Sequence, residues 1–168
     1  MIQEGEQLPE GKVWELPVEW SVGCPSGPEP ISVRDAVRGK RVVIFGLPGA
    51  YTRTCSAKHL PGYVELADRL RARGVDEIWC FSVNDAMVMA AWGKDNDAGG
   101  RVRMIGDGSA EYTRALGLEL DLTARGMGMR CQRFSMLVED GKLVRLNLEP
   151  GGQYGVSSAE TMLEQLGG

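Results

Sequence analysis

The chain has 168 residues, 43% of them hydrophobic and 25% charged, and a formal net charge of -4. This composition is typical of a globular protein, and the length suits a single domain over residues 1–168. The acidic balance offers no basic stripe for phosphates, and the longest apolar run, Val42 to Leu47, is far too short to cross a bilayer. Neither nucleic acid nor a membrane is therefore an expected partner.

The cysteines and the single histidine bound the possible chemistry. The first residues show no basic start followed by an apolar stretch, so we expect a cytosolic protein whose four cysteines are mainly kept as thiols. One histidine and no C-x-x-C pair leave a zinc site short of its usual ligands, so no metal is expected.

The first half of the chain predicts a strand, helix, strand unit. Residues 24–30 are rich in Pro, Gly and Ser and predict a surface loop. Residues 41–46 and 77–83 read as buried strands, and the helix between them should kink or restart at Pro61-Gly62. Asn84-Asp85 then offers a cap for a helix through Trp92, followed by a polar stretch over residues 94–100.

The second half predicts a hairpin and a last helix. A short strand near residues 102–105 and a helix over 110–116 precede strands over 134–139 and 142–148, which flank a two-residue Asp140-Gly141 turn. Ser157 and Glu160 have the spacing of a capping box that opens the last helix. This order predicts an α/β fold, a thioredoxin-like sandwich with a central mixed sheet flanked by helices.

One cysteine is placed for reactivity. Cys55 follows a Pro48-Gly49 turn and lies at an expected helix start, where backbone amides carry partial positive charge that favours the thiolate. The residues alone leave a packed, inert Cys55 as the alternative. They also leave Pro48 as a loop proline, and Thr52 as a helix cap.

Several motifs in order resemble one family. They are Pro48-x-x-x-Thr52-x-x-Cys55, His59-Leu60-Pro61-Gly62-Tyr63, Ser82-Val83-Asn84-Asp85 with Trp92-Gly93, and Arg133-Phe134-Ser135-Met136. Over roughly Gly5 to Leu166 the chain resembles peroxiredoxins, specifically the subfamily of mammalian peroxiredoxin five and plant type II enzymes. The resemblance implies reduction of hydrogen peroxide or alkyl hydroperoxides by a cysteine thiolate that becomes a sulfenic acid, with no metal or bound organic cofactor.

The resemblance also implies roles for individual residues. Cys55 is the implied nucleophile, and Pro48 shields its thiolate from water. The Thr52 hydroxyl, the backbone amides of Thr54 and Cys55, and the Arg133 guanidinium are the implied donors to the peroxide. Arg130 lies three residues before Arg133, and from the residues alone either could be a solvated charge; register with the family selects Arg133.

The source of the second thiol stays open. Cys80, inside a predicted strand, matches the position that plant type II enzymes use for an internal disulfide, although a cysteine there is more often core packing. The mammalian enzyme has its resolving cysteine in a late loop, where this chain has none near Ser157. Otherwise glutathione with glutaredoxin, or thioredoxin, would re-reduce Cys55. Cys24 and Cys131 read as bystanders.

Two further expectations rest on analogy or on a single position. His59, four residues after Cys55, shares its helix face if that turn is regular, and either orients the site or is a packed histidine. Subfamily members commonly dimerise, and Tyr51 and Trp92 are the expected contributors to a homodimer contact.

The alternative function is a peroxide-sensing redox relay or chaperone with little turnover. A general thiol-disulfide oxidoreductase lacks its usual C-x-x-C here.

Overall fold

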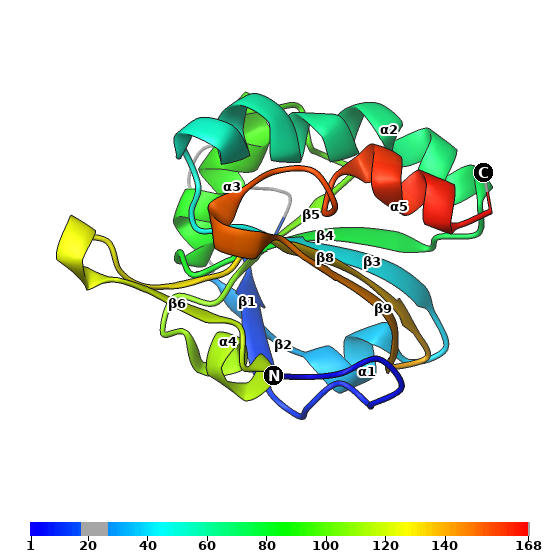
Figure 1. Ribbon diagram of the computed structural model, residues 1–168, viewed down its shortest axis with the longest axis horizontal. Helices are drawn as coiled ribbons and strands as arrows, with labels where there is room; N and C mark the ends of the chain where they lie inside the picture. The colour runs from blue at the N-terminus through cyan, green and yellow to red at the C-terminus, as the bar shows by residue number, and fades with distance from the viewer. Residues whose placement is uncertain (18–26, 168) are drawn as a thin grey trace.

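The computed structural model describes residues 1–17 and 27–167, without the side chains of Cys55 and Ser56 (Figure 1). In chain order its elements are β1 (Lys12–Glu15), β2 (Glu29–Ser32), α1 (Val33–Val37), β3 (Arg41–Gly46), the π-helical turn η1 (Cys55–His59), α2 (Leu60–Ala72), β4 (Glu77–Ser82), α3 (Ala86–Asp95), β5 (Arg103–Gly106), α4 (Glu111–Leu116), β6 (Glu119–Leu122), the 3-10 turn η2 (Thr123–Arg125), β7 (Gly128–Cys131), β8 (Phe134–Glu139), β9 (Lys142–Leu148), the 3-10 turn η3 (Pro150–Gly152) and α5 (Ala159–Gln165).

A seven-stranded mixed sheet in the order β2-β1-β5-β4-β3-β8-β9 forms the centre of the molecule. Strands β3, β4 and β5 are parallel, whereas β8 pairs antiparallel with β3 and β9 pairs antiparallel with β8. Helices cover both faces of the sheet (Figure 1). The predicted α/β class, a thioredoxin-like sandwich with a central mixed sheet, is confirmed.

Two apolar clusters lie on opposite faces of the sheet. One packs α2, α3 and α5 against the sheet and includes Phe45, Tyr63, Cys80 and Trp92. The other packs α1 and α4 and includes Phe134 and Cys131. Because the parallel strands β3 and β4 are covered on both faces, their residues are buried almost without interruption, as their sequences indicate.

The hairpin and the strand before the cysteine match their predictions. Strand β3 covers the predicted residues 41–46, and β8 and β9 flank Asp140 and Gly141, whose φ angles of 48° and 81° are those of a type I′ turn. The helix was predicted to kink or restart at Pro61-Gly62; it is unbroken there, since His59 is itself αR, but it changes from π-helical in η1 to α-helical in α2 at Leu60, directly before Pro61. Because proline lacks the N–H that a helical hydrogen bond uses, a change of helix type at this point is physically reasonable.

Other segments differ from expectation. The predicted loop over residues 24–30 overlaps β2, which begins at Glu29 and includes Pro30 as an edge-strand residue, while Cys24 lies outside the described residues. Helix α3 continues to Asp95, inside the predicted polar loop. The β6–β7 hairpin, which projects from the body in Figure 1, was not predicted; its strands are only partly buried and lack the apolar runs that mark the central strands.

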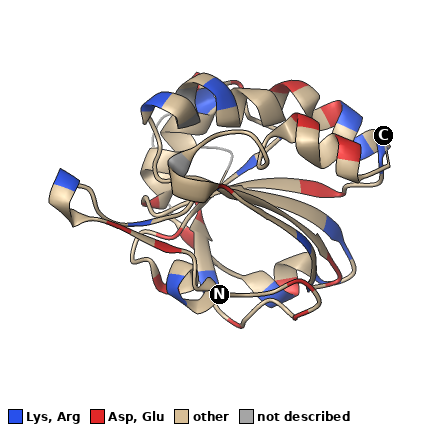
Figure 2. Cartoon of the chain, in the orientation of Figure 1, with Lys and Arg blue, Asp and Glu red and all other residues tan. Residues whose placement is uncertain are grey.

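The described chain shows neither a large region of one charge nor a long apolar helix. Lys and Arg are interspersed with Asp and Glu over the helices and strands (Figure 2). Among the described residues, no helix combines the length and apolarity needed to cross a bilayer.

Candidate functional site

The turn after β3 is fixed by the end of β4. Leu47 N donates to Phe81 O at 3.2 Å, and the Ser82 hydroxyl donates to Leu47 O at 3.1 Å. Ala50 N donates to Asn84 Oδ1 at 2.9 Å. Because both ends of the turn are bonded to neighbouring backbone or side chains, the residues that follow enter the next helix from a fixed position.

Thr52 lies directly before the helix start. Residues 53 and 54 are helical and lead into η1, so Thr54 and Cys55 belong to the first turn. The Thr52 hydroxyl donates to Gly49 O at 2.8 Å, which ties it to the turn. The first N–H groups of a helix have no acceptor within it, so the amides of Thr54 and Cys55 are placed where a developing anion would be stabilised.

The backbone of Cys55 is the first residue of η1, but its side chain lies outside the described part of the structure. Its role as nucleophile, and those of Pro48, Thr52, Thr54 and Arg133 toward a peroxide, therefore stay predictions. His59 was expected to share a helix face with Cys55 only if the turn between them were a regular α-helical turn. That turn is π-helical, so the spacing of four residues does not place the two side chains on one face.

Arg130 holds the Pro48 turn. Its Nη1 donates to Pro48 O at 3.0 Å and its Nε donates to Met127 O at 2.9 Å. A Cβ at Gly49 would overlap Nη1, so the close approach of the arginine requires glycine at that position. Arg130, in strand β7, thus links the β6–β7 hairpin to the turn before Cys55.

Arg133 occupies a different environment, between β7 and β8. It is only 5% exposed, and its Nη1 donates to Nδ1 of His59 at 2.9 Å. His59 is the last residue of the turn that begins with Cys55. The structure therefore places a buried cation against the turn that carries Cys55. This cation is Arg133, the arginine that matches the family motif, and not Arg130.

His59 is neutral in this arrangement. It is fully buried, and its Nε2 lies 3.1 Å from Ser157 O. A carbonyl only accepts and a guanidinium only donates, so the tautomer with hydrogen on Nε2 satisfies both neighbours. Burial and the charge of Arg133 lower the pKa of His59 to about 3, partly opposed by the Ser157 hydrogen bond.

The loop beyond β9 completes this side of the site. The carboxylate of Glu149 accepts from the Ser157 hydroxyl at 2.6 Å and from Ser157 N at 2.9 Å. The predicted capping box was wrong in its first residue: Ser158, not Ser157, caps α5, accepting from Thr161 N at 3.2 Å. Glu149 was missed because nothing in the sequence joins it to Ser157.

Cys80 is fully buried in the middle of the sheet. It lies in β4, with Phe45 of β3 and Met104 of β5 as its register partners. Its predicted pairing with Cys55 would require β4 to open. Cys131 is also buried, and its thiol donates to Leu47 O at 3.1 Å, so it packs against the turn.

Trp92 does not fit its predicted place in a dimer contact. It is 1% exposed and packs within the cluster under α3, so it has almost no surface to offer a partner. Tyr51 is 54% exposed, and its hydroxyl donates to Asp95 Oδ2 at 2.7 Å, which raises the pKa of Tyr51. Only Tyr51 of this pair is available to a second chain.

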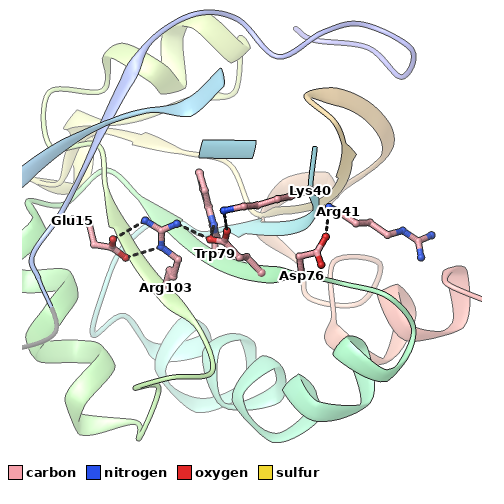
Figure 3. A network of polar contacts seen from close by, with 7 residues as sticks. Glu15, Lys40, Arg41, Asp76, Trp79 and Arg103 are labelled. Carbon is pink, nitrogen blue, oxygen red and sulfur yellow. Dashed lines mark hydrogen bonds and ion pairs between the residues drawn. The ribbon is translucent and has the colours of Figure 1, made fainter. Parts of the chain in front are cut away.

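A second cluster of charge, drawn in Figure 3, lies at the amino ends of the parallel strands, where Glu77 begins β4 and Arg103 begins β5; the Cys55 turn follows the opposite end of β3. Arg103 donates to both oxygens of Glu15, at 2.7 and 3.0 Å, and to Glu77 at 2.6 Å. Lys40 and the indole of Trp79 also donate to Glu77. All these charges are paired with one another, so the cluster ties strands together. Among the described residues no His, Cys, Asp and Glu group suits a metal ion.

Comparison with known proteins gives consistent matches. The redoxin family profile matches residues 3–163. The chain is similar to Peroxiredoxin-2B of Arabidopsis thaliana, with 52% identity over 135 residues, 80% of this chain and 83% of that protein. Peroxiredoxin-2C of Oryza sativa subsp. japonica is 43% identical over 165 residues, 98% of both chains. The crystal structure of reduced Prx3 in complex with H2O2 from Vibrio vulnificus has a TM-score of 0.91 and 43% identity, covering 99% of both chains.

Proposed function

The chain belongs to the redoxin family and is a peroxiredoxin, a thiol-dependent peroxidase, and from this premise we propose that Cys55 reduces hydrogen peroxide and alkyl hydroperoxides at the site described above. The observation that carries the proposal is the buried Arg133 guanidinium, bonded at 2.9 Å to His59 of the turn that begins with Cys55. The similar Vibrio vulnificus protein was crystallised in complex with H2O2, which supports the substrate class.

The proposed step is an in-line attack of the Cys55 thiolate on one peroxide oxygen. The S–O bond forms as the O–O bond breaks, and the second oxygen leaves with the electron pair as hydroxide or alkoxide, which takes a proton from water. The sulfur is oxidised to the sulfenic acid and the peroxide is reduced to water or an alcohol.

Lowering the pKa of the thiol cannot supply most of the acceleration. An unperturbed cysteine of pKa ~8.5 is about 3% thiolate at pH 7, so full ionisation adds at most roughly thirtyfold. The remainder is assigned to donors that stabilise charge on the departing oxygen: the amides of Thr54 and Cys55, the Arg133 guanidinium, and the Thr52 hydroxyl, which must turn from Gly49 O to donate to the peroxide. Pro48 would keep water from the thiolate.

We propose that an external thiol re-reduces the sulfenic acid, through glutathione with glutaredoxin or through thioredoxin. The burial of Cys80 in the central strand β4 supports this route over an internal disulfide. A peroxide-sensing relay would need the same donors for the oxidation of Cys55, so it is the family membership of the chain that favours turnover over sensing.

Steady-state peroxide consumption with a thiol donor tests the function. Cys55→Ser is expected to abolish consumption, whereas Cys131→Ser, which removes the buried thiol that packs against the turn before Cys55, should retain most of it. Consumption by Cys55→Ser at the wild-type rate would reject Cys55 as the nucleophile.

A homodimer and a cytosolic location are also proposed. Tyr51 supports the first, since it lies beside the site and is 54% exposed. Sedimentation of wild type and Tyr51→Ala should show a weaker dimer in the variant. An unchanged association constant would remove Tyr51 from the contact.

A further inference from the structure

Glu149 is a buried carboxylate to which the proposed reaction gives no role. It directly follows β9 and is 4% exposed. Its Oε2 accepts from Gly155 N at 2.6 Å, from Ser157 N at 2.9 Å and from the Ser157 hydroxyl at 2.6 Å. Burial alone would raise the pKa of Glu149, but these hydrogen bonds outweigh it and hold the pKa below its ordinary range. Glu149 is therefore a charged anchor for the loop before α5.

The anchored loop presents one carbonyl to the site. Ser157 O accepts from Tyr63 Oη at 2.9 Å and from His59 Nε2 at 3.1 Å. Because this carbonyl fixes the proton on Nε2, the other ring nitrogen, Nδ1, must act as an acceptor. Nδ1 is the atom to which Arg133 Nη1 donates.

The contacts form a closed ring. Glu149 N donates to Arg133 O at 3.0 Å, so the residue that anchors the loop is also bonded to the backbone of the arginine. From Arg133 the ring runs through its side chain to His59, through His59 to Ser157, and through Ser157 back to the Glu149 carboxylate. Each member of the ring has a fixed donor or acceptor role, so none can rotate alone without breaking a buried hydrogen bond.

We propose that Glu149 and His59 are positioning residues for the Arg133 guanidinium: the Glu149 carboxylate holds the Ser157 carbonyl in place, this carbonyl sets the tautomer of His59, and Nδ1 of His59 aims the guanidinium at the peroxide. The inference rests on the proposed function. Neither residue touches the reacting atoms in this scheme. It differs from a purely structural role because it predicts a loss confined to reactions that need Arg133.

Two reagents separate these roles. Hydrogen peroxide requires a donor to the departing oxygen, whereas iodoacetamide needs only the Cys55 thiolate. A misaimed Arg133 therefore slows oxidation by peroxide more than alkylation. Stopped-flow oxidation of the reduced protein and iodoacetamide alkylation of Cys55 give the two rate constants.

His59 offers a matched pair of variants. Asn keeps an acceptor oxygen near the position of Nδ1, whereas Gln keeps an amide donor near Nε2 but loses the acceptor. Both substitutions remove the imidazole and so lose its tilted aromatic contacts with Phe45 and Tyr63 equally. His59→Gln should lower the peroxide rate constant roughly tenfold or more, and His59→Asn should be several-fold faster than His59→Gln.

Glu149→Gln tests the anchor, because it keeps the shape and removes the charge. We expect a roughly tenfold lower peroxide rate constant and an iodoacetamide rate constant within about twofold of wild type. If Glu149→Gln does not fold, Ser157→Ala removes one of the three donors to the carboxylate and should show the same selective loss at smaller size.

Equal losses with both reagents, or an unchanged peroxide rate constant, would overturn the positioning role. Equal rates for His59→Asn and His59→Gln would also do so. These failures are distinct from failure of the proposed function, which peroxide consumption by Cys55→Ser would reveal on its own.

Discussion

At the scale of single residues, the partners of each arginine decide its role. Arg130 donates to two backbone carbonyls, those of Pro48 and Met127, so its contacts hold a turn. Arg133 is buried, and the imidazole of His59 that accepts from it is neutral. Burying a guanidinium is costly, and stabilisation of a developing anion is a use that would justify the cost.

The titration of His59 gives a prediction about stability. Its pKa is about 3 in the folded chain, against about 6.5 when exposed to water. Below that exposed value the unfolded chain binds a proton that the folded chain does not bind, so stability is complete above it and falls as the pH falls. Denaturant titrations between about pH 7 and pH 5 should show a loss of about 2 kcal/mol from this histidine.

The control for this prediction is His59→Asn, which does not titrate. Its free energy of unfolding should fall less than that of wild type over the same pH range. The lowered pKa of Glu149 acts in the same direction, but mainly below about pH 4.5, so it leaves this interval nearly unaffected. Parallel curves for the two proteins would contradict a neutral, buried His59.

At the scale of elements, the end of β3 leaves no room for a side chain. A Cβ at Gly46 would overlap the ring of Phe134, the residue directly after Arg133. Gly46→Ala should therefore lower the free energy of unfolding by about 1–3 kcal/mol, as measured by chemical denaturation. Gly99→Ala is the matched control, since its Cβ would meet nothing within 4 Å. Equal stability of the two variants would show that β8 shifts freely against β3.

The strand that carries Cys80 leads to a prediction about the oxidised enzyme. β4 is paired with β3 on one side and β5 on the other, so moving Cys80 to Cys55 would break hydrogen bonds in both ladders. After one equivalent of peroxide, mass spectrometry with a sulfenic-acid trap should find the trap on Cys55. A Cys55 to Cys80 disulfide as the main product would mean that β4 opens readily.

Elements that depend on local chemistry were the ones that could be predicted. The β8–β9 hairpin follows from Asp140-Gly141 between two apolar runs, and the change from π-helix to α-helix at Leu60 lies next to Pro61. The cap of α5 was placed one residue early because Glu160 lies three residues after Ser157, the spacing of a capping box, whereas in the structure Ser157 bonds to Glu149 and Ser158 is the cap. Strands β1 and β2 have four residues each and little alternation, so they depend on tertiary pairing.

At the scale of the whole molecule, the two ends of the parallel strands carry different groups of polar residues. The carboxyl ends of β3 and β4 lead into the turn before Cys55 and its supporting residues. The amino ends carry the Arg103, Glu15 and Glu77 network, in which each charge is paired (Figure 3). We therefore expect substitutions at the amino ends to act on stability and those at the carboxyl ends to act on rate.

Only part of the site could be predicted from the sequence, because only some of its residues lie close together along the chain. Pro48, Thr52 and Cys55 share one short motif, and Arg133 was placed by family register. The Glu149, Ser157 and His59 contacts span 8 to 98 residues of sequence separation. No local pattern encodes such contacts, so they emerge only when the sheet and the loop before α5 are placed together.

The most direct test is the second-order rate constant for oxidation of Cys55 by hydrogen peroxide in Arg133→Met, measured by stopped flow. Loss of one transition-state donor should lower it roughly a hundredfold or more. Arg103→Met, at the other end of the strands, should lower stability and leave this rate near that of wild type. Oxidation of Arg133→Met at the wild-type rate would contradict the assignment of the buried guanidinium to peroxide reduction.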